Sequence, residues 1–500
     1  MPTVEQEPHK FAWKRYRAFA GLILCLTATS LLNAQNPPSP SPSPITFAGV
    51  KLSGSLRVRP EIWDWYDTNA ADPNYGYFAS LLRLSFSQER PKWDWQAEFA
   101  MPLLLGLPDH SIAPPPQGQL GLGANYFAAN GDSNAAYFFA KQGFVRRKGI
   151  FGDKSSSLRL GRFEFIEGTE IIPKDATLAS LKRDRIAHRL VGNFAFSHVG
   201  RSLDGVQFVR AASGMNLTFV GARATQGVFQ VKGWGELDTD ILYGALTRPV
   251  GKKSPGEFRA FALSYHDGRR ALKNDNRSVA ARAADQHNIR VTSVGGNYLQ
   301  TLKAGSATVD LLFWGVGQFG SWGVLSHRAA AIAVEAGIQP NLKLKPWFRA
   351  GYFYGTGDRD PNDRTHGSFF QVLPTPRIYA RFPFYNLMNN QDAFAEGIVR
   401  PHPKWTVRSD AHFLRLSDRH DLWYTGGGAF QPETFGFVGR PSSGSQSLAN
   451  VYDASVEYQL RPHMTLTGYY ARATGRTVIQ KIYPNGGTGQ FGYGELNWKF

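Results

Sequence analysis

The sequence has a single cysteine, little helical periodicity and no long hydrophobic run. Cys25 lies in an apolar stretch near the N-terminus, so the remaining chain has no thiol for a disulfide, a metal site or a catalytic nucleophile. A transmembrane helix needs about 20 consecutive apolar residues, and the stretch around Cys25 is shorter. The one candidate helix beyond it is a short basic segment around residues 176–190. These absences exclude a disulfide-stabilised fold and a helical membrane protein.

The N-terminal residues have the order of a secretory signal peptide. An uncharged, mostly apolar stretch at 18–32 precedes the small residue Ala34 and follows four basic residues, Lys10, Lys14, Arg15 and Arg17. A basic region, an apolar region and a small residue, in that order, mark a segment that is removed on secretion. We therefore expect residues 1–34 to be cleaved, residues 35–45 to form a Pro/Ser-rich tether, and residues 46–500 to fold as one domain.

The chain is strongly basic. Its 56 lysines and arginines exceed its 39 aspartates and glutamates, and loss of the four basic and two acidic residues of the signal peptide lowers the net charge of +17 by two. A charge of this sign favours an anionic partner. The basic residues are spread along the whole chain rather than gathered on a nucleic-acid-binding module, which argues against nucleic acid. An anionic saccharide and the lipid head groups of a membrane suit a secreted protein better.

Polar and apolar residues alternate repeatedly after residue 50. In 452–460 the apolar residues alternate with Asp453, Ser455, Glu457 and Gln459, and the segments 82–89 and 93–99 repeat the pattern on either side of an Arg90-Pro91 turn. Alternation of this period predicts β-strands with one apolar and one polar face, and two such strands around a tight turn predict an antiparallel hairpin. A soluble β-sandwich alternates in the same way, so other features must decide where the strands lie.

Aromatic residues and loop lengths favour a membrane barrel. Long polar loops at 101–135, 358–390 and 417–449 alternate with tight turns such as Arg461-Pro462, which gives a barrel one looped and one trimmed rim. Trp and Tyr also cluster near the expected strand ends, where outer-membrane barrels carry aromatic girdles: Trp63, Trp65, Tyr66, Trp347, Tyr352, Tyr354, Tyr469 and Tyr470.

The chain ends on a strand whose apolar face is formed by Leu496, Trp498 and Phe500. A last strand that ends on Phe is typical of bacterial outer-membrane barrels, and we expect these three residues to be the signal that the barrel assembly machinery reads. A closed barrel satisfies its backbone hydrogen bonds without a helix, which explains a mean hydropathy of only −0.31. The predicted fold is all-β: a single transmembrane antiparallel β-barrel of about 18 strands with long extracellular loops, in the bacterial outer membrane.

Two segments resemble the alginate export family of outer-membrane channels. One is 201–206, with Arg201, Asp204 and Gly205, and the other is 354–363, with Asp358 and Asp360. The resemblance implies an 18-stranded barrel with an arginine-rich constriction through which an anionic polysaccharide passes. It also implies export, with the possibility of periplasmic partners that deliver the polymer.

Seven arginines occupy the polar parity of clear strands, and we expect them to line the lumen as a substrate path: Arg57, Arg59, Arg83, Arg259, Arg290, Arg349 and Arg408. A guanidinium stays charged and binds carboxylates bidentately, so a series of them draws an anionic polymer along without trapping it. Acidic residues share this face, namely Asp94, Glu98, Asp453, Glu457 and Glu495. The alternative is therefore that acids and arginines pair to keep a polar lumen in order.

No catalytic residue, metal site or cofactor is expected. Asp358, Asp360 and Asn362 have the alternate spacing of calcium ligands, but Asp363 and Phe369 stand where a calcium loop needs glycine and glutamate, so a solvated turn is the better interpretation. The histidines are scattered, and nothing groups them with a nucleophile.

The favoured function is an outer-membrane channel for an anionic polysaccharide or oligosaccharide. The alternatives are a general or small-acid-selective porin and, third, a barrel enzyme or adhesin.

Overall fold

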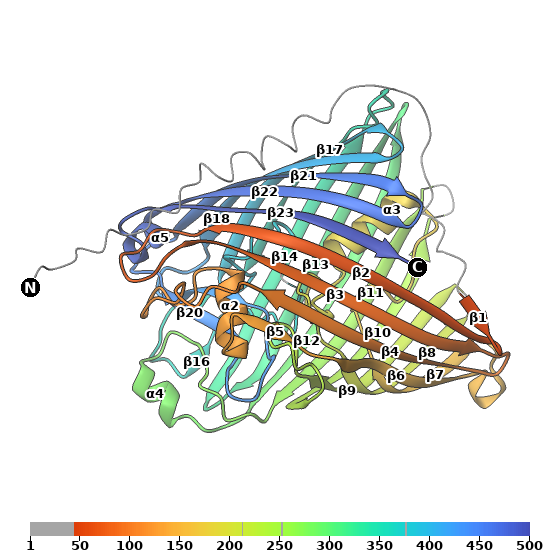
Figure 1. Cartoon of the computed structure of the whole chain (residues 1–500), viewed down its shortest axis with the longest axis horizontal. Helices are drawn as coiled ribbons and strands as arrows, with labels where there is room; N and C mark the ends of the chain where they lie inside the picture. The colour runs from red at the N-terminus through yellow and green to blue at the C-terminus, as the bar shows by residue number, and fades with distance from the viewer. Residues whose placement is uncertain (1–44, 213, 252–253, 376–377) are drawn as a thin grey trace, which may run out of the picture.

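A computed structural model describes residues 45–212, 214–251, 254–375 and 378–500 (Figure 1). The predicted signal peptide at 1–34 lies outside the described residues, as does the predicted tether at 35–45 except for Ile45. Ile45 begins β1 (Ile45–Phe47), a short strand that pairs with the start of the first long strand. The cleavage site and the tether therefore stay predictions.

Eighteen long strands form one closed barrel in which each strand is antiparallel to its neighbours. The first long strand, β2, pairs with the last, β23, and this pairing closes the ring. The count confirms the predicted architecture. The barrel strands are β2 (Val50–Asp64), β3 (Asn74–Glu89), β4 (Trp93–Leu105), β6 (Phe139–Lys148), β7 (Ser156–Phe163), β8 (Leu203–Ala212), β9 (Met215–Thr225), β10 (Glu236–Val250), β11 (Gly256–Asp267), β12 (Ile289–Ala304), β13 (Ala307–Trp322), β14 (Leu325–Gln339), β15 (Trp347–Gly355), β17 (Asn390–His402), β18 (Trp405–Leu416), β21 (Ser447–Arg461), β22 (Met464–Gly475) and β23 (Thr488–Lys499).

The seam of the barrel is completed by the last residue of the chain. The amide of Gly54 donates to the carbonyl of Phe500 over 2.7 Å, and the amide of Phe500 donates back over 3.0 Å. The Phe500 ring lies directly over Gly54, where a Cβ atom would stand 2.6 Å from the ring. Glycine at this position therefore lets the terminal aromatic ring pack flat against the neighbouring strand.

The two rims of the barrel differ as predicted. At one end, which we call the turn rim, the strands are joined by short turns such as 90–92, 403–404 and 462–463, and the C-terminus lies there. At the other end, the loop rim, most connections are long, although 323–324 is a tight turn. The long ones carry α2 (Leu122–Asn130), α4 (Val279–Ala284), α5 (Thr477–Ile482) and the hairpin of β19 (Leu422–Gly426) with β20 (Phe437–Pro441). In the described part of the chain, no helix is long and apolar enough to cross a membrane.

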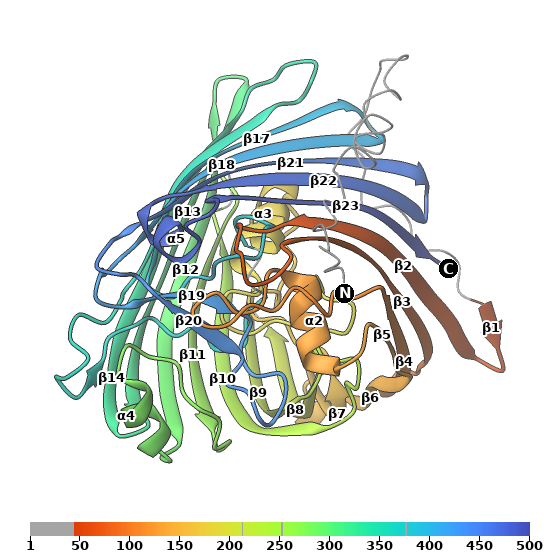
Figure 2. The same ribbon diagram turned by 60° about the vertical axis from the view of Figure 1, so that its left-hand side comes forward.

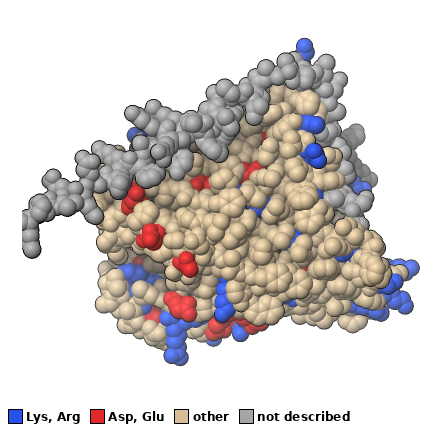
Figure 3. Space-filling view, viewed as in Figure 1, with Lys and Arg blue, Asp and Glu red and all other residues tan. Residues whose placement is uncertain are grey.

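The outer face of the barrel is apolar. Large hydrophobic side chains project from it, for example Leu242, which is 66% exposed, and Phe319, which is 55% exposed. Charged side chains on the visible face are concentrated toward the rims (Figure 3). An exposed apolar band of this kind is what a lipid-facing barrel requires.

Several aromatic residues that were predicted to form girdles lie inside the barrel instead, and that prediction is wrong for them. Trp63, Tyr66 and Trp347 are at most 3% exposed, and Trp63 stacks on Phe491 with a ring separation of 4.1 Å. Only Tyr352 and Tyr470 of the predicted set project outward as large exposed side chains. For Trp63 and Tyr66 the physical reason is that loops fold into the barrel at the loop rim, so the inner wall there packs against protein. Trp347 lies at the turn-rim end of β15, where its indole donates to the inner-face carboxylate of Asp310 over 2.7 Å.

The most important of these loops connects β7 to β8. Residues 164–202, which we call the inner loop, contain α3 (Ala176–Leu181) and a π-helical turn over Lys182–Ile186. Figures 1 and 2 show α3 inside the ring of strands. A second inward segment, the long loop 356–389, is joined to it by backbone hydrogen bonds between Gly192 and Leu373 and between Leu373 and Leu190, each 2.8 Å. The predicted helix around 176–190 is thus confirmed over its first part, in the lumen.

Candidate functional site

Arginines of the barrel wall bind acids of the inner loop. Arg259 on β11 donates to Glu167 over 2.6 Å and also contacts Glu170 at 3.2 Å. Arg83 on β3 bonds Glu164 over 2.8 Å and is also paired with its wall neighbour Glu98. These predicted lumen arginines do point inward, but the inner loop covers them.

Basic residues of the inner loop bind acids of the wall in return. Lys182 contacts Glu257 on β11 at 2.6 Å, and Arg185 contacts Glu396 on β17 at 2.8 Å. Arg189 lies 3.4 Å from Glu335, the carboxylate that also binds the wall residue Arg349 at 2.8 Å.

The inner loop is therefore held by ion pairs of both polarities. Removing one partner of a buried pair leaves an uncompensated charge and typically costs about 3–5 kcal/mol. Arg259, which is nearly inaccessible to solvent, therefore anchors the loop directly, whereas Arg349 reaches the loop only through the carboxylate of Glu335.

The tip of the inner loop is clamped to the first barrel strand. Arg57 donates to the carbonyls of Ala195 and Ser197, and Arg59 donates to the carbonyl of Phe196 over 2.6 Å. The Arg59 guanidinium also lies 4.2 Å from the centre of the Phe196 ring. Both arginines also border a cavity.

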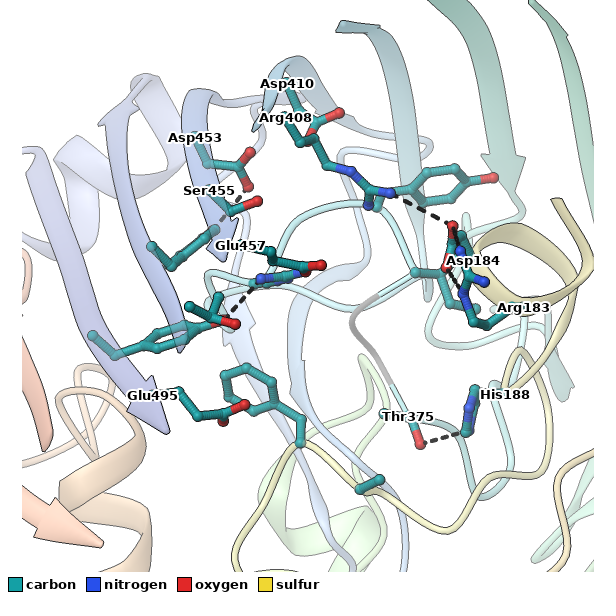
Figure 4. Close-up of a pocket in the computed structure, with 18 of the residues that line it drawn as sticks. Arg183, Asp184, His188, Thr375, Arg408, Asp410, Asp453, Ser455, Glu457 and Glu495 are labelled. Atoms are coloured by element: carbon teal, nitrogen blue, oxygen red, sulfur yellow. Dashed lines mark hydrogen bonds and ion pairs between the residues drawn. The ribbon is translucent and has the colours of Figure 1, made fainter. Parts of the chain in front are cut away.

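A cavity of about 350 Å³, the charged cavity, lies between the inner loop and the wall formed by β2, β18 and β21–β23 (Figure 4). Tyrosine and threonine side chains contribute hydroxyl groups to it, including Thr375 and Tyr469. Its lining contains five arginines, Arg57, Arg59, Arg183, Arg381 and Arg408. It also contains five acids, Asp184, Asp410, Asp453, Glu457 and Glu495, so the cavity is highly charged and formally balanced.

Three arginines of the cavity keep part of their surface accessible. The side chain of Arg183 is 67% exposed, that of Arg381 27% and that of Arg408 26%. Their acidic partners Asp184 and Glu457 lie at 2.8 to 3.5 Å and are themselves partly exposed, and Arg408 also contacts the buried Glu396 at 3.4 Å. Exposed pairs of this kind are weak, so a solute carboxylate can compete for these guanidinium groups.

His188 contributes a neutral group to the same cavity. Its Nδ1 lies 3.2 Å from the Thr375 hydroxyl, and burial lowers the pKa of the imidazole to about 4. At neutral pH this side chain is therefore a hydrogen-bonding group without charge.

A second cavity, the outer vestibule, lies at the loop rim and has a different lining. It also measures about 350 Å³ and is bordered by the rings of Phe229, Phe430, Phe435 and Phe437 together with amide side chains such as Asn274. It contains one charged residue among the described residues, Glu433. Of the two cavities, the charged cavity is thus the one whose lining offers several charged groups.

One predicted lumen residue faces the wrong way. Arg290 is exposed on the outer parity of β12, in line with Val294 and Tyr298, and its cross-strand neighbour is the outward-facing His266. Ile289 and Val291 on either side of it are buried and face inward. The prediction that polar strand positions face the lumen is wrong here, because loops fill this end of the barrel. The inner positions therefore pack against protein and are apolar, and the charged Arg290 lies on the outer face.

The residues that carry the family resemblance are structural. Arg201 is buried and donates to the carbonyl of Gly427 over 2.6 Å, and burial lowers its pKa to about 9. Asp204 pairs with Arg162, and a Cβ at Gly205 would stand 2.2 Å from a backbone oxygen of β9. Arg201 therefore ties the base of the inner loop to the loop between β18 and β21.

The second family segment forms turns and a contact between loops. The Asp360 carboxylate accepts from the Asn362 amide over 2.9 Å, as in a side-chain-stabilised turn. The Asp358 amide donates to Asp421 over 3.0 Å, which joins loop 356–389 to loop 417–446. No group of three or more His, Cys, Asp or Glu side chains in the described ranges has an arrangement that could hold a metal ion.

Sequence reasoning missed Arg183, Arg381, Asp184 and Asp410 as cavity residues. The first three lie on loops, where alternation gives no orientation, and only the folding of those loops into the barrel brings them to the wall. Asp410 stands on the polar parity of β18 beside Arg408, so the same strand pattern could have identified it.

Residues 243–475 match the family described as alginate export, which confirms the predicted resemblance over this stretch. No curated protein sequence matches the chain.

Solved outer-membrane channels share the fold at low sequence identity. OpdK of Pseudomonas aeruginosa, solved with vanillate, has a TM-score of 0.54 and 8% identity over 90% of this chain and 98% of that one. OccAB4 of Acinetobacter baumannii has a TM-score of 0.53 and 9% identity over 91% and 98%. OccK2 (OpdF) of Pseudomonas aeruginosa, solved in complex with glucuronate, has a TM-score of 0.53 and 8% identity over 90% and 98%. The chain thus has the barrel fold of these outer-membrane proteins, and residues 243–475 resemble an export family.

Proposed function

We propose that this barrel, which matches the alginate export family over 243–475, is an outer-membrane channel that passes an anionic saccharide of oligosaccharide size or smaller through the charged cavity. The observation that carries the proposal is the group of accessible guanidinium groups on Arg183, Arg381 and Arg408 in one cavity. The turn rim then lies in the periplasm, with the C-terminus, and the apolar outer band contacts lipid.

The size of the solute follows from the inner loop. The loop fills the lumen beside a cavity of about 350 Å³, which is at the lower end of the range of about 300–1,000 Å³ that small-molecule sites occupy. A short saccharide or a small acid suits such a space better than a thick polymer does. Channels of similar fold were solved with vanillate and with glucuronate, which are both small carboxylates.

The mixed charge of the cavity explains how a bound solute is released. An arginine guanidinium binds a carboxylate through two parallel hydrogen bonds, which favours entry of an anion. The acids that already partner these arginines compete for them, so each contact stays weak enough to break. Transport needs this balance between binding and release.

The test is block of single-channel current in a planar bilayer by glucuronate, with glucose as the uncharged match. We expect glucuronate to reduce wild-type current and glucose to have little effect. In the double variant Arg183→Gln with Arg381→Gln, glucuronate should bind at least tenfold more weakly. Arg210→Gln, at an exposed pair with Asp153 outside the cavity, is the control and should bind as the wild type does. Equal block by both sugars in the wild type would refute the proposal.

A second candidate is passage of a longer anionic polysaccharide, which the family match favours. A polymer would require the inner loop to leave the lumen, against the ion pairs of Arg259, Lys182 and Arg185. Oligo-uronates of increasing length distinguish the two candidates. If the affinity of the channel for the oligomer stops rising once the oligomer is longer than the cavity, the short solute is favoured. If the affinity rises with every added sugar ring, the polymer is favoured.

A further inference from the structure

Three acids lie side by side across the inner face of adjacent strands. Glu396 on β17 is the cross-strand partner of Asp410 on β18, and Asp410 is the partner of Asp453 on β21. Carboxylates in direct cross-strand positions repel one another, so such a row needs compensating groups.

The two outer members of the row have partners. Glu396 contacts Arg185 at 2.8 Å and Arg408 at 3.4 Å. Asp453 accepts a hydrogen bond of 2.8 Å from the hydroxyl of Tyr469. Glu396 is therefore ion-paired, and one oxygen of Asp453 is hydrogen-bonded.

Asp410, between them, has none. It is 5% exposed, its Oδ1 is shielded from solvent, and no side chain or backbone group of the described residues donates a hydrogen bond to its carboxylate. Buried polar groups are almost always paired, and a buried carboxylate without a partner is costly. Such a group either holds a proton or awaits a cationic ligand.

Asp410 also lines the charged cavity. Figure 4 shows Asp410, Asp453, Ser455 and Glu457 along the wall of β18 and β21, with Arg183 and His188 on the opposite side. These four residues make one stretch of the wall rich in oxygen atoms, in which Arg408 also stands, and Asp184 lies beside Arg183 on the opposite side.

We infer that Asp410, with Asp453 and Ser455, is a binding site for the ammonium group of the transported solute, so that the preferred solute carries an amine as well as a carboxylate. A primary ammonium is a compact charge with three donors, which suits two carboxylates and a hydroxyl. The described residues offer no cluster fit for a metal ion, so an organic ammonium is the fitting cation. The inference rests on the proposed function, because the arginines take the carboxylate of the same solute.

The test compares 6-aminohexanoate with hexanoate, which differ only in the amine, by block of single-channel current. For the wild type we expect 6-aminohexanoate to bind at least tenfold more tightly. In Asp410→Asn this preference should disappear while hexanoate binds as before. Asp94→Asn, which removes a wall acid outside the cavity, is the matched control and should keep the preference.

The outcomes separate the two proposals. Equal block by both compounds in the wild type overturns the ammonium site, leaves the carboxylate channel intact, and assigns a proton to Asp410. Block by neither compound counts against the proposed function itself. If Asp410→Asn fails to insert into the bilayer, the wild-type comparison still decides, because it does not need the variant.

Discussion

The outer and inner faces of the barrel wall are made by the same strands, yet they differ in what their side chains contact. The outer face meets lipid along most of its height, and its large exposed residues there, such as Leu242 and Phe319, are mostly apolar. The inner face meets charge and water near the turn rim, around Glu457, and meets folded loops near the loop rim, around Trp322. Strand alternation therefore places a side chain on a face, but the loops decide what that face contacts.

The largest expected effect comes from reversing a charge under the inner loop. Arg259→Glu would set a third carboxylate beside Glu167 and Glu170 and remove a buried pair worth about 3–5 kcal/mol. We expect the inner loop to be released and single-channel conductance to rise several-fold. Arg290→Glu makes the same substitution on the outer face, where the side chain is exposed, and should leave conductance unchanged. Similar conductance in both variants would refute the anchoring role of the wall arginines.

A smaller effect is expected at the seam, where the outer face is completed by Phe500. Deleting Phe500 removes two backbone hydrogen bonds to Gly54 and the ring that covers it, and it shortens the face of Leu496 and Trp498 that we expect the assembly machinery to read. The folded, heat-modifiable population in the outer membrane should fall. Phe500→Tyr keeps the ring and should assemble normally. Undiminished amounts of the truncated barrel would contradict the assembly role.

The smallest expected effect concerns pH and the contact between loops 356–389 and 417–446. Burial and the neighbouring Asp421 raise the pKa of Asp358 to about 7, above the usual 3.8. A carboxyl whose pKa is raised by folding stabilises the folded loops fully below about pH 4, and this contribution is lost as the pH rises through about 7. Proteolysis of loop 356–389 should therefore become faster between pH 5 and 8. In Asp358→Asn the rate should depend less on pH, and an unaltered pH dependence would rule out Asp358 as the titrating group.

Much of the barrel could be predicted from the sequence, because lipid imposes a simple alternating pattern on one face. The strand count, the two kinds of rim and the inward direction of Arg57, Arg59 and Arg83 all followed from it. The misplacement of Arg290 and of Trp63 has a different origin. Both lie where inner-face residues pack against loops, and a loop has no periodicity that reveals where it folds.

The candidate site was predictable only in part for the same reason. Arg408 and Glu457 were found through their strands, whereas Arg183 and Arg381 enter the cavity on the inner loop and the long loop. The alternative interpretation, in which wall arginines pair with acids, describes Arg259 and Arg349 in this structure. Roles in solute passage for the cavity arginines stay proposals until the channel is measured.

The central claim is that accessible arginines in the charged cavity set the selectivity of the channel. Its most direct test is the reversal potential in a salt gradient for the double variant Arg183→Glu with Arg381→Glu. The matched control is Arg210→Glu with Arg290→Glu, which changes the total charge equally outside the cavity. We expect the reversal potential of the cavity variant to shift toward cation preference and that of the control to equal the wild-type value. Equal shifts in both variants, or no shift in a folded cavity variant, would contradict the account.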